Sequence, residues 1–247
     1  MRIEHAGDVA LVRMEAGKAN AIGPAFLSSL SALMDGLGDA SAAVITGQGS
    51  AFSAGLDLPS LVELDRPAMR EFMERFDEVV LRIFELPQPL IAAINGHAIA
   101  GGCVLALQAD VRIAADRDLR IGLNETQLGI GLPAIVLETL RFQVPGTSLA
   151  PIALEGRLFS PREALQLGLV HEVVPEAELL DRAMQRAKAL AALPPYGVRQ
   201  VKAALRRPVA DAVRAEDASR SKSWLDSWFS PGGQKTVRAA VERLKRK

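Results

Sequence analysis

The sequence predicts a layered α/β fold around a large hydrophobic core. Apolar residues make up 49% of the 247 residues, which is enough for a sizeable core. Short runs of apolar residues at 9–14, 43–46, 90–94 and 111–114 are typical of buried strands. The longer segments between them carry apolar residues at helical spacing, and strands that alternate with helices indicate an α/β layered core.

The first helices are predicted from apolar stripes with clear start and stop signals. One helix begins at Pro24, where proline suits a first helical turn, and it is stopped by Gly36 and Gly38. A longer helix opens near Pro67 and ends before Pro87.

The second half of the core follows the same pattern. A helix over residues 101–109 separates the strands 90–94 and 111–114. Residues 160–163 (SPRE) form a capping box with proline at the first helical position, which predicts another helix start. Gly168 ends that helix, and residues 169–174 form a further strand.

The chain divides best near residue 193. From Glu176 onward the pattern is almost entirely helical, and the LPP sequence at 193–195 interrupts it. We therefore expect a core of residues 1–193, which carries the functional site, and a C-terminal helical region of residues 194–247.

The composition excludes several classes of protein. Lys+Arg and Asp+Glu both number 29, so the net charge of zero argues against a nucleic-acid partner. Residues 90–109 are apolar but broken by glycine and polar residues, so we predict a strand, a turn and a helix rather than a membrane span. Cys103 is the only cysteine, and residues 1–5 do not resemble a signal peptide, so we expect a cytoplasmic protein without an internal disulfide.

One carboxylate, Glu125, stands out beside two glycine-bearing segments. These are residues 52–58 (FSAGLDL) and 95–103 (NGHAIAGGC), which follow short apolar strands. Glycine lets backbone N–H groups approach a ligand closely, so donors from the two segments could stabilise one oxyanion while Glu125 moves a proton. The position where a second acid could help is Val104, and a single acid favours a proton shuttle over the addition of water.

Other motifs permit competing interpretations. Residues 47–49 (GQG) match a dinucleotide-binding turn poorly. Ser53 lies in a near match to a hydrolase nucleophile elbow, but Ala51 replaces its first glycine. Gly101 and Gly102 favour an anion site at a helix start and close helix–strand packing about equally. His97 is expected in a turn and has no second ligand at metal spacing.

Taken together, these segments resemble the crotonase superfamily, also called enoyl-CoA hydratase/isomerase, over nearly the whole chain. The landmarks are Asn20, residues 52–57, residues 95–103, Asp110, Glu125 and residues 160–174. Residues 121–130 (IGLNETQLGI), 55–58 (GLDL) and 241–245 (VERLK) are similar to the Δ3,Δ2-enoyl-CoA isomerases of unsaturated fatty-acid breakdown.

The resemblance implies a spiral of ββα turns and a C-terminal helical region that builds trimers, so a homotrimer or a dimer of trimers is expected. It implies an acyl-CoA thioester ligand, with no cofactor beyond the coenzyme A of the substrate and no metal. The oxyanion donors would be the backbone N–H groups of Leu56 and Gly101, and Glu125 would be the acid/base. The residues expected to line the site near the CoA are Ala54, Gly55, Asp57 and Leu58, and Asn124 would border the acyl pocket.

The chain departs from the hydratases of the superfamily at two places. Hydratases carry a second glutamate where this chain has Val104, and a glycine-rich turn where it reads GLPAI at 131–135. The expected reaction is therefore the isomerisation of 3-enoyl-CoA to trans-2-enoyl-CoA in fatty-acid degradation. The alternatives are an enoyl-CoA hydratase, another crotonase-type enzyme, or a non-catalytic acyl-CoA binder. Apolar neighbours such as Leu123 and Leu128 are expected to raise the pKa of Glu125.

Overall fold

The computed structural model describes residues 1–17, 19–215 and 218–245. Its main sheet has the strand order β1-β2-β3-β5-β7-β9, with β1 antiparallel to β2 and the other neighbours parallel. The strands of this sheet are β1 (Arg2–Ala6), β2 (Val9–Arg13), β3 (Ala42–Thr46), β5 (Leu90–Ile94), β7 (Val111–Asp116) and β9 (Glu172–Pro175). Every residue of β3 and β5 is buried, which explains their continuous apolar sequences.

A smaller parallel sheet has the order β4-β6-β8. Its strands are β4 (Ala51–Ser53), β6 (His97–Ile99) and β8 (Ile121–Gly122). Each follows a strand of the main sheet and precedes helices: α3 (Arg66–Phe84) after β4, α4 (Gly101–Leu107) after β6, and α5 (Ala134–Gln143) after β8. This succession is the spiral of ββα turns that the family resemblance implied.

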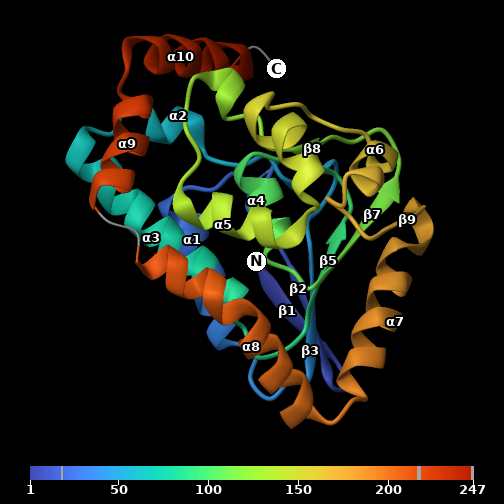
Figure 1. The fold of residues 1–247 in the computed structure, drawn as a ribbon. Helices are drawn as coiled ribbons and strands as arrows, with labels where there is room; N and C mark the ends of the chain where they lie inside the picture. Colours follow the sequence, from blue (N-terminus) through green and yellow to red (C-terminus); the bar gives the residue numbers. More distant parts are fainter. Residues whose placement is uncertain (18, 216–217, 246–247) are drawn as a thin grey trace.

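Helix packing on the main sheet is dominated by one helix. Helix α7 (Leu179–Ala191) packs against β2, β3, β5 and β7, and it flanks the sheet in Figure 1. Helix α1 (Pro24–Asp35) packs on α3, whose first turn is capped by the Asp65 carboxylate. The remaining short elements are α2 (Leu58–Leu61), η1 (Thr126–Leu128), η2 (Gly146–Ser148), η3 (Ala150–Leu154), α6 (Pro161–Gln166) and η4 (Glu176–Glu178).

Most predicted elements are confirmed, with two kinds of correction. The capping box at the start of α6 is present, with both Ser160–Glu163 bonds formed. The strand predicted over 169–174 begins only at Glu172, because the N–H groups of Leu169 and Val170 bond back to Ala164 after a left-handed Gly168. His97 lies in β6 rather than in a turn, and the strands of the smaller sheet were not predicted.

The C-terminal region is helical, as predicted, with α8 (Pro195–Arg214), α9 (Ala218–Trp228) and α10 (Pro231–Lys245). Buried ion pairs fix α8 to the core: Asp110 contacts Lys202 and Arg206, each at 2.6 Å. Desolvation lowers the pKa of Lys202 to about 8, so the burial cost offsets much of the attraction. The pairs orient α8, whereas a domain boundary between 193 and 194 stays a prediction.

In the described part of the chain, no helix combines the length and apolar character needed to cross a membrane. The apolar stretch 90–109 forms β5, β6 and the buried helix α4.

Candidate active site

Three segments meet at one edge of the smaller sheet. Neighbouring parallel strands end at the same edge, so the residues that follow β4, β6 and β8 lie side by side. Leu56, Gly101 and Glu125 each follow their strand by at most three residues. The topology therefore brings together the residues that the sequence singled out.

The N–H group of Leu56 points away from Ile22, the residue with which Leu56 pairs in an isolated parallel bridge. Ile22 N donates to Gly55 O at 2.8 Å, and Asp57 N donates to Ile22 O at 3.0 Å, so these groups face Ile22. The N–H of the intervening Leu56 faces the opposite side, because successive peptide groups alternate along extended chain. Among the hydrogen bonds of the described residues, neither the N–H of Leu56 nor that of Gly101 has an acceptor.

Contacts at Gly55 and Gly101 show how closely these segments approach. A methyl group built on Gly55 would lie 2.9 Å from the Gly101 nitrogen, and one built on Gly101 would lie 3.5 Å from the Leu56 nitrogen. Between β6 and α4 the chain turns at Ala100, a non-glycine residue with φ of 52°, and the Ala100 carbonyl accepts from Val104 N at 3.0 Å. Strain of this kind gathers at functional sites.

Glu125 stands directly before η1 with one carboxylate oxygen buried. Its Oε2 has no hydrogen-bond partner within the described structure. Desolvation raises the pKa of Glu125 to about 7, and the backbone amides of Glu125 and Asn124 offset part of that effect. The shift has the direction that its apolar surroundings predicted.

The Glu125 carboxylate lies close enough to the first turn of α4 to act on the charge of the Cys103 thiol. Burial raises the pKa of the Cys103 thiol to about 12, and the charge of Glu125 contributes to that rise. Because Cys103 stands two positions after Gly101, the carboxylate lies near the helix turn that carries the free Gly101 amide. The buried carboxylate oxygen and the two N–H groups without acceptors thus lie in one region of the structure.

The other predicted site residues lie on the same segments. Ala54 is exposed and its N–H donates to Ala19 O at 2.9 Å, while Asp57 and Leu58 begin α2 and are partly exposed. Asn124, which precedes Glu125 in the sequence, has a buried Oδ1 that likewise lacks a partner among the described residues. The roles of these residues toward a ligand stay predictions.

Asn20 and two C-terminal hydroxyls support the site in ways that the sequence did not reveal. The buried Asn20 side chain accepts from Ala16 N at 2.8 Å and donates to Phe52 O at 3.0 Å, joining the first loop to β4. Ser227 and Thr236 bond to the turn after Glu125. Nothing in the local sequence around these hydroxyls signals that contact.

The competing motifs have structural roles. The Ser53 hydroxyl is buried, donates to Asn20 O at 2.8 Å and accepts from Gly55 N at 3.2 Å, which argues against a nucleophile. His97 Nδ1 accepts from Arg120 N at 3.0 Å. Across the described residues, His, Cys, Asp and Glu side chains form no group that could hold a metal ion.

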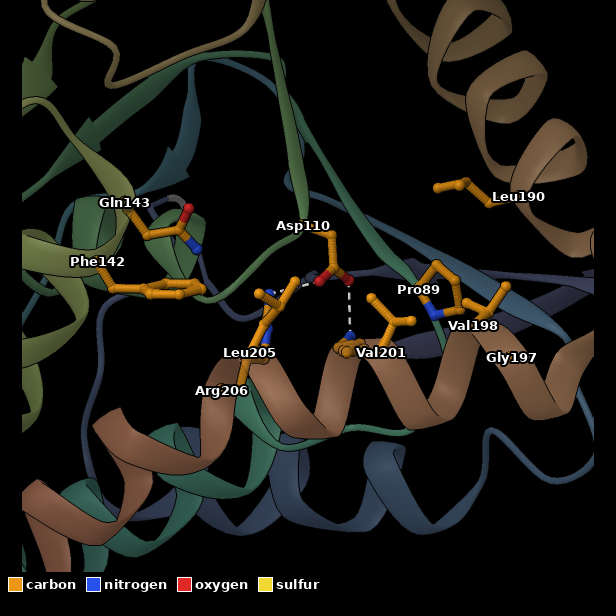
Figure 2. Close-up of a pocket in the computed structure, with 11 residues that line it drawn as sticks. Pro89, Asp110, Phe142, Gln143, Leu190, Gly197, Val198, Val201, Leu205 and Arg206 are labelled. Atoms are coloured by element: carbon orange, nitrogen blue, oxygen red, sulfur yellow. Dashed lines mark hydrogen bonds and ion pairs between the residues drawn. The ribbon is translucent and has the colours of Figure 1, made fainter.

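A separate cavity lies between α8 and the core, with a volume of about 530 Å³ (Figure 2). Its apolar walls include Phe142, Val201 and Leu205, and the Asp110 carboxylate faces α8 across its floor. Leu56, Gly101 and Glu125 are not among the residues that line it. This cavity therefore does not belong to the candidate active site.

Comparison with known proteins places the chain in a family. It matches the model of the enoyl-CoA hydratase/isomerase family over residues 4–247. It is 36% identical over 196 residues to human enoyl-CoA delta isomerase 1, mitochondrial, in an alignment that covers 78% of this chain and 65% of the human protein. It is 32% identical over 246 residues to a putative enoyl-CoA hydratase of Thermus thermophilus, covering 96% of each protein.

Solved structures agree with this assignment. The crystal structure of human mitochondrial Δ3-Δ2-enoyl-CoA isomerase superposes with a TM-score of 0.94 at 29% sequence identity, covering 100% of this chain and 99% of that chain. The chain belongs to the enoyl-CoA hydratase/isomerase family, and the resemblance and the crotonase fold predicted from its sequence are confirmed.

Replacing Gly55 with alanine should push the two amide-bearing segments apart. The new methyl group would lie 2.7 Å from Ile99 O and 2.9 Å from Gly101 N, both backbone atoms, at a residue with φ of +84°. We expect a loss of about 2–4 kcal/mol in unfolding free energy and weaker binding of butanoyl-CoA, measured by urea denaturation and calorimetry.

Gly38→Ala is the matched control, because Gly38 has φ of +54° and no atom within 4 Å of the added methyl group. This variant should lose only about 1 kcal/mol in unfolding free energy, because its single cost is the left-handed backbone of a residue with a side chain. Equal effects from the two substitutions would show that close packing at Gly55 does not matter.

Proposed function

We propose that this protein isomerises 3-enoyl-CoA to trans-2-enoyl-CoA by a proton shuttle on Glu125. The observation that carries the proposal is the convergence of one buried carboxylate with the unpartnered N–H groups of Leu56 and Gly101. An acyl-CoA ligand fits the family to which the chain belongs.

The two amides would bind the thioester oxygen of the substrate. Removing a proton from C2 moves negative charge onto this oxygen, so fixed donors stabilise the resulting enolate more than the neutral carbonyl. A single donor of this kind typically contributes about 2.7–4 kcal/mol to the transition state. Donors held by backbone on touching segments need little rearrangement when the charge develops.

Glu125 would then move one proton between two carbons. Its carboxylate takes the proton from C2, and the electron pair of that C–H bond delocalises onto the thioester oxygen as a dienolate. The protonated Glu125 returns the proton to C4, so the double bond moves from C3–C4 to C2–C3. A pKa of about 7 suits a group that must act as base and then as acid near neutral pH.

Val104 supports isomerisation over hydration. It is a buried apolar residue in the first turn of α4, where the hydratases of the superfamily are expected to carry a second glutamate. Without a polar group there, water has no second acid to activate it. Hydration stays the second candidate, because one relative that aligns over 96% of both proteins is described as a putative enoyl-CoA hydratase.

The remaining assignments follow the same proposal. The residues proposed to bind the substrate are Ala54, Gly55, Asp57 and Leu58 for the CoA portion and Asn124 for the acyl portion. The reaction needs no group beyond the coenzyme A of the substrate. The cytoplasmic location and the role in fatty-acid degradation stay predictions, and one human relative is described as mitochondrial.

We also propose a homotrimer or a dimer of trimers. Helix α8 leaves large apolar side chains in solvent: Tyr196 is 85% exposed, Leu205 60% and Val201 53%, and the last two also line the cavity of Figure 2. Apolar clusters of this kind often mark protein–protein contacts. Helices α9 and α10 instead pack on α2, α3 and η1 of their own chain, so α8 is the C-terminal element that supports the proposal.

Glu125→Gln should reduce turnover of 3-enoyl-CoA by about 100-fold or more, because the amide cannot accept the C2 proton. Butanoyl-CoA should bind nearly as before, because the amide donors are unchanged. Turnover is followed by the ultraviolet absorbance of the conjugated product and binding by calorimetry.

Glu178→Gln, which changes an exposed carboxylate, is the control and should leave turnover unchanged. A Glu125→Gln variant that turns over normally would remove Glu125 from the mechanism. Rapid formation of 3-hydroxyacyl-CoA from 2-enoyl-CoA by the unmodified protein would favour the hydratase instead.

Turnover should depend on pH through Glu125. Burial raises the pKa of this carboxyl from its ordinary value near 4.5 to about 7, and only the deprotonated form accepts the C2 proton. The ratio kcat/KM should therefore rise with pH through about 7 and fall roughly tenfold per pH unit below it. A rate that stays constant between pH 5.5 and 8 would contradict a buried carboxylate as the base.

Light scattering in solution should give three or six times the mass of one chain. Leu205→Asp places a charge on the exposed apolar face of α8 and should shift the protein toward single chains. A single-chain mass for the unmodified protein at micromolar concentration would contradict the proposed assembly.

A further inference from the structure

The turn that follows Glu125 is bonded to two helices from the far end of the chain. Gly131 N donates to Ser227 Oγ of α9 at 2.9 Å. Thr236 Oγ1 of α10 donates to Leu128 O. The two bonds hold the turn from both of its ends.

Backbone hydrogen bonds within the turn connect Leu128, and the residue before Gly131, to Glu125. The N–H groups of Leu128 and Ile130 both donate to Glu125 O, at 2.9 and 3.0 Å. Gly129 lies between them in a left-handed conformation with φ of 72° and ends η1. The backbone of Glu125 therefore shifts if Leu128 or Gly131 shifts.

The hydroxyls of Ser227 and Thr236 can each make the hydrogen bond to the turn with the protons and lone pairs that they have. Ser227 Oγ donates its single proton to Trp224 O at 2.6 Å, which leaves lone pairs free to accept from Gly131 N. Thr236 has one proton and three neighbouring carbonyls, of which Leu128 O is nearer than Gly232 O and Gly233 O at 2.9 and 3.0 Å. Both hydroxyls thus have a defined partner on the turn.

The helices that carry these hydroxyls are themselves firmly packed. Trp228 and Val237 are fully buried, and Leu225 is nearly so. Helix α10 contacts both η1 and α2, and α2 follows the segment that carries the Leu56 amide; Figure 1 shows α10 next to α2. The α9–α10 pair therefore touches both sides of the candidate active site.

We infer that Ser227 and Thr236 are positioning residues, which hold the Glu125 turn in register with the amides of Leu56 and Gly101. The inference rests on the proposed function, because these hydroxyls act through Glu125 and do not touch the substrate. Displacement of a reacting group by about 1 Å can cost about 100-fold in rate, so two hydrogen bonds on this turn are enough to matter.

The test compares Ser227→Ala and Thr236→Val with two matched controls. Ser28→Ala and Thr139→Val likewise remove a helical hydroxyl that donates to a carbonyl of its own helix, but neither of these hydroxyls bonds to the Glu125 turn. With 3-enoyl-CoA, kcat should fall about 10-fold or more in the first pair, while KM changes less than about 3-fold. The apparent pKa of the kcat profile should move below that of the unmodified protein, because a looser turn admits water to Glu125.

Hydrogen exchange of the peptide covering residues 123–131 provides a readout that needs no turnover. It should be faster in Ser227→Ala and Thr236→Val and unchanged in the controls. Thr236→Ser keeps the hydroxyl and should restore both exchange and kcat. Unchanged exchange and unchanged kcat in folded Ser227→Ala and Thr236→Val would overturn the inference.

The two proposals fail in different ways. If the unmodified protein does not isomerise 3-enoyl-CoA, the proposed function fails, and exchange still reports whether the hydroxyls hold the turn. If it does isomerise and the variants match the controls, only the positioning role fails.

Discussion

The parallel pairing of β4, β6 and β8 is the constraint on which the candidate site depends. These strands are only two or three residues long, and their ladder bonds alone would not hold them together. Each instead follows a strand of the main sheet after only a few residues, so the register of the main sheet restricts where the short strand begins. The large core therefore determines the relative positions of Leu56, Gly101 and Glu125.

The candidate site contains polar groups without hydrogen-bond partners and a strained backbone, both of which lower the stability of the fold. Two backbone N–H groups lack acceptors, one oxygen of Glu125 is buried without a partner, and Ala100 holds a positive φ. An unmet buried polar group costs about 1–3 kcal/mol, and the strain at Ala100 costs a similar amount. Burial of apolar residues elsewhere in the core offsets these costs, as is common where a protein prepares a site for a charged species.

Local sequence patterns predicted the long elements well, but they did not locate the three strands of the smaller sheet. The buried stripe of α1 and the apolar run of β5 are long enough to be recognised in the sequence. The capping-box pair Ser160 and Glu163 marks the start of α6. The strands β4, β6 and β8 are too short to show an alternation. Ala100 gives no sign of its unusual backbone, because positive φ is expected of glycine.

The candidate site was found from the sequence only through local patterns. Glu125 and the two glycine-bearing segments could be named because each stands in a recognisable run of residues. Ser227 and Thr236 could not, because they reach the same turn across 96 and 108 residues of chain. Contacts of that span depend on how the C-terminal helices fold back, which no short motif records.

A crystal structure with bound butanoyl-CoA, a saturated thioester that cannot isomerise, tests the central claim most directly. The account predicts that the thioester oxygen lies about 2.7–3.1 Å from the backbone nitrogens of both Leu56 and Gly101. It also predicts that the carboxylate of Glu125 lies against C2. A thioester oxygen bound by other groups, or a Glu125 carboxylate turned away from the acyl chain, would contradict it.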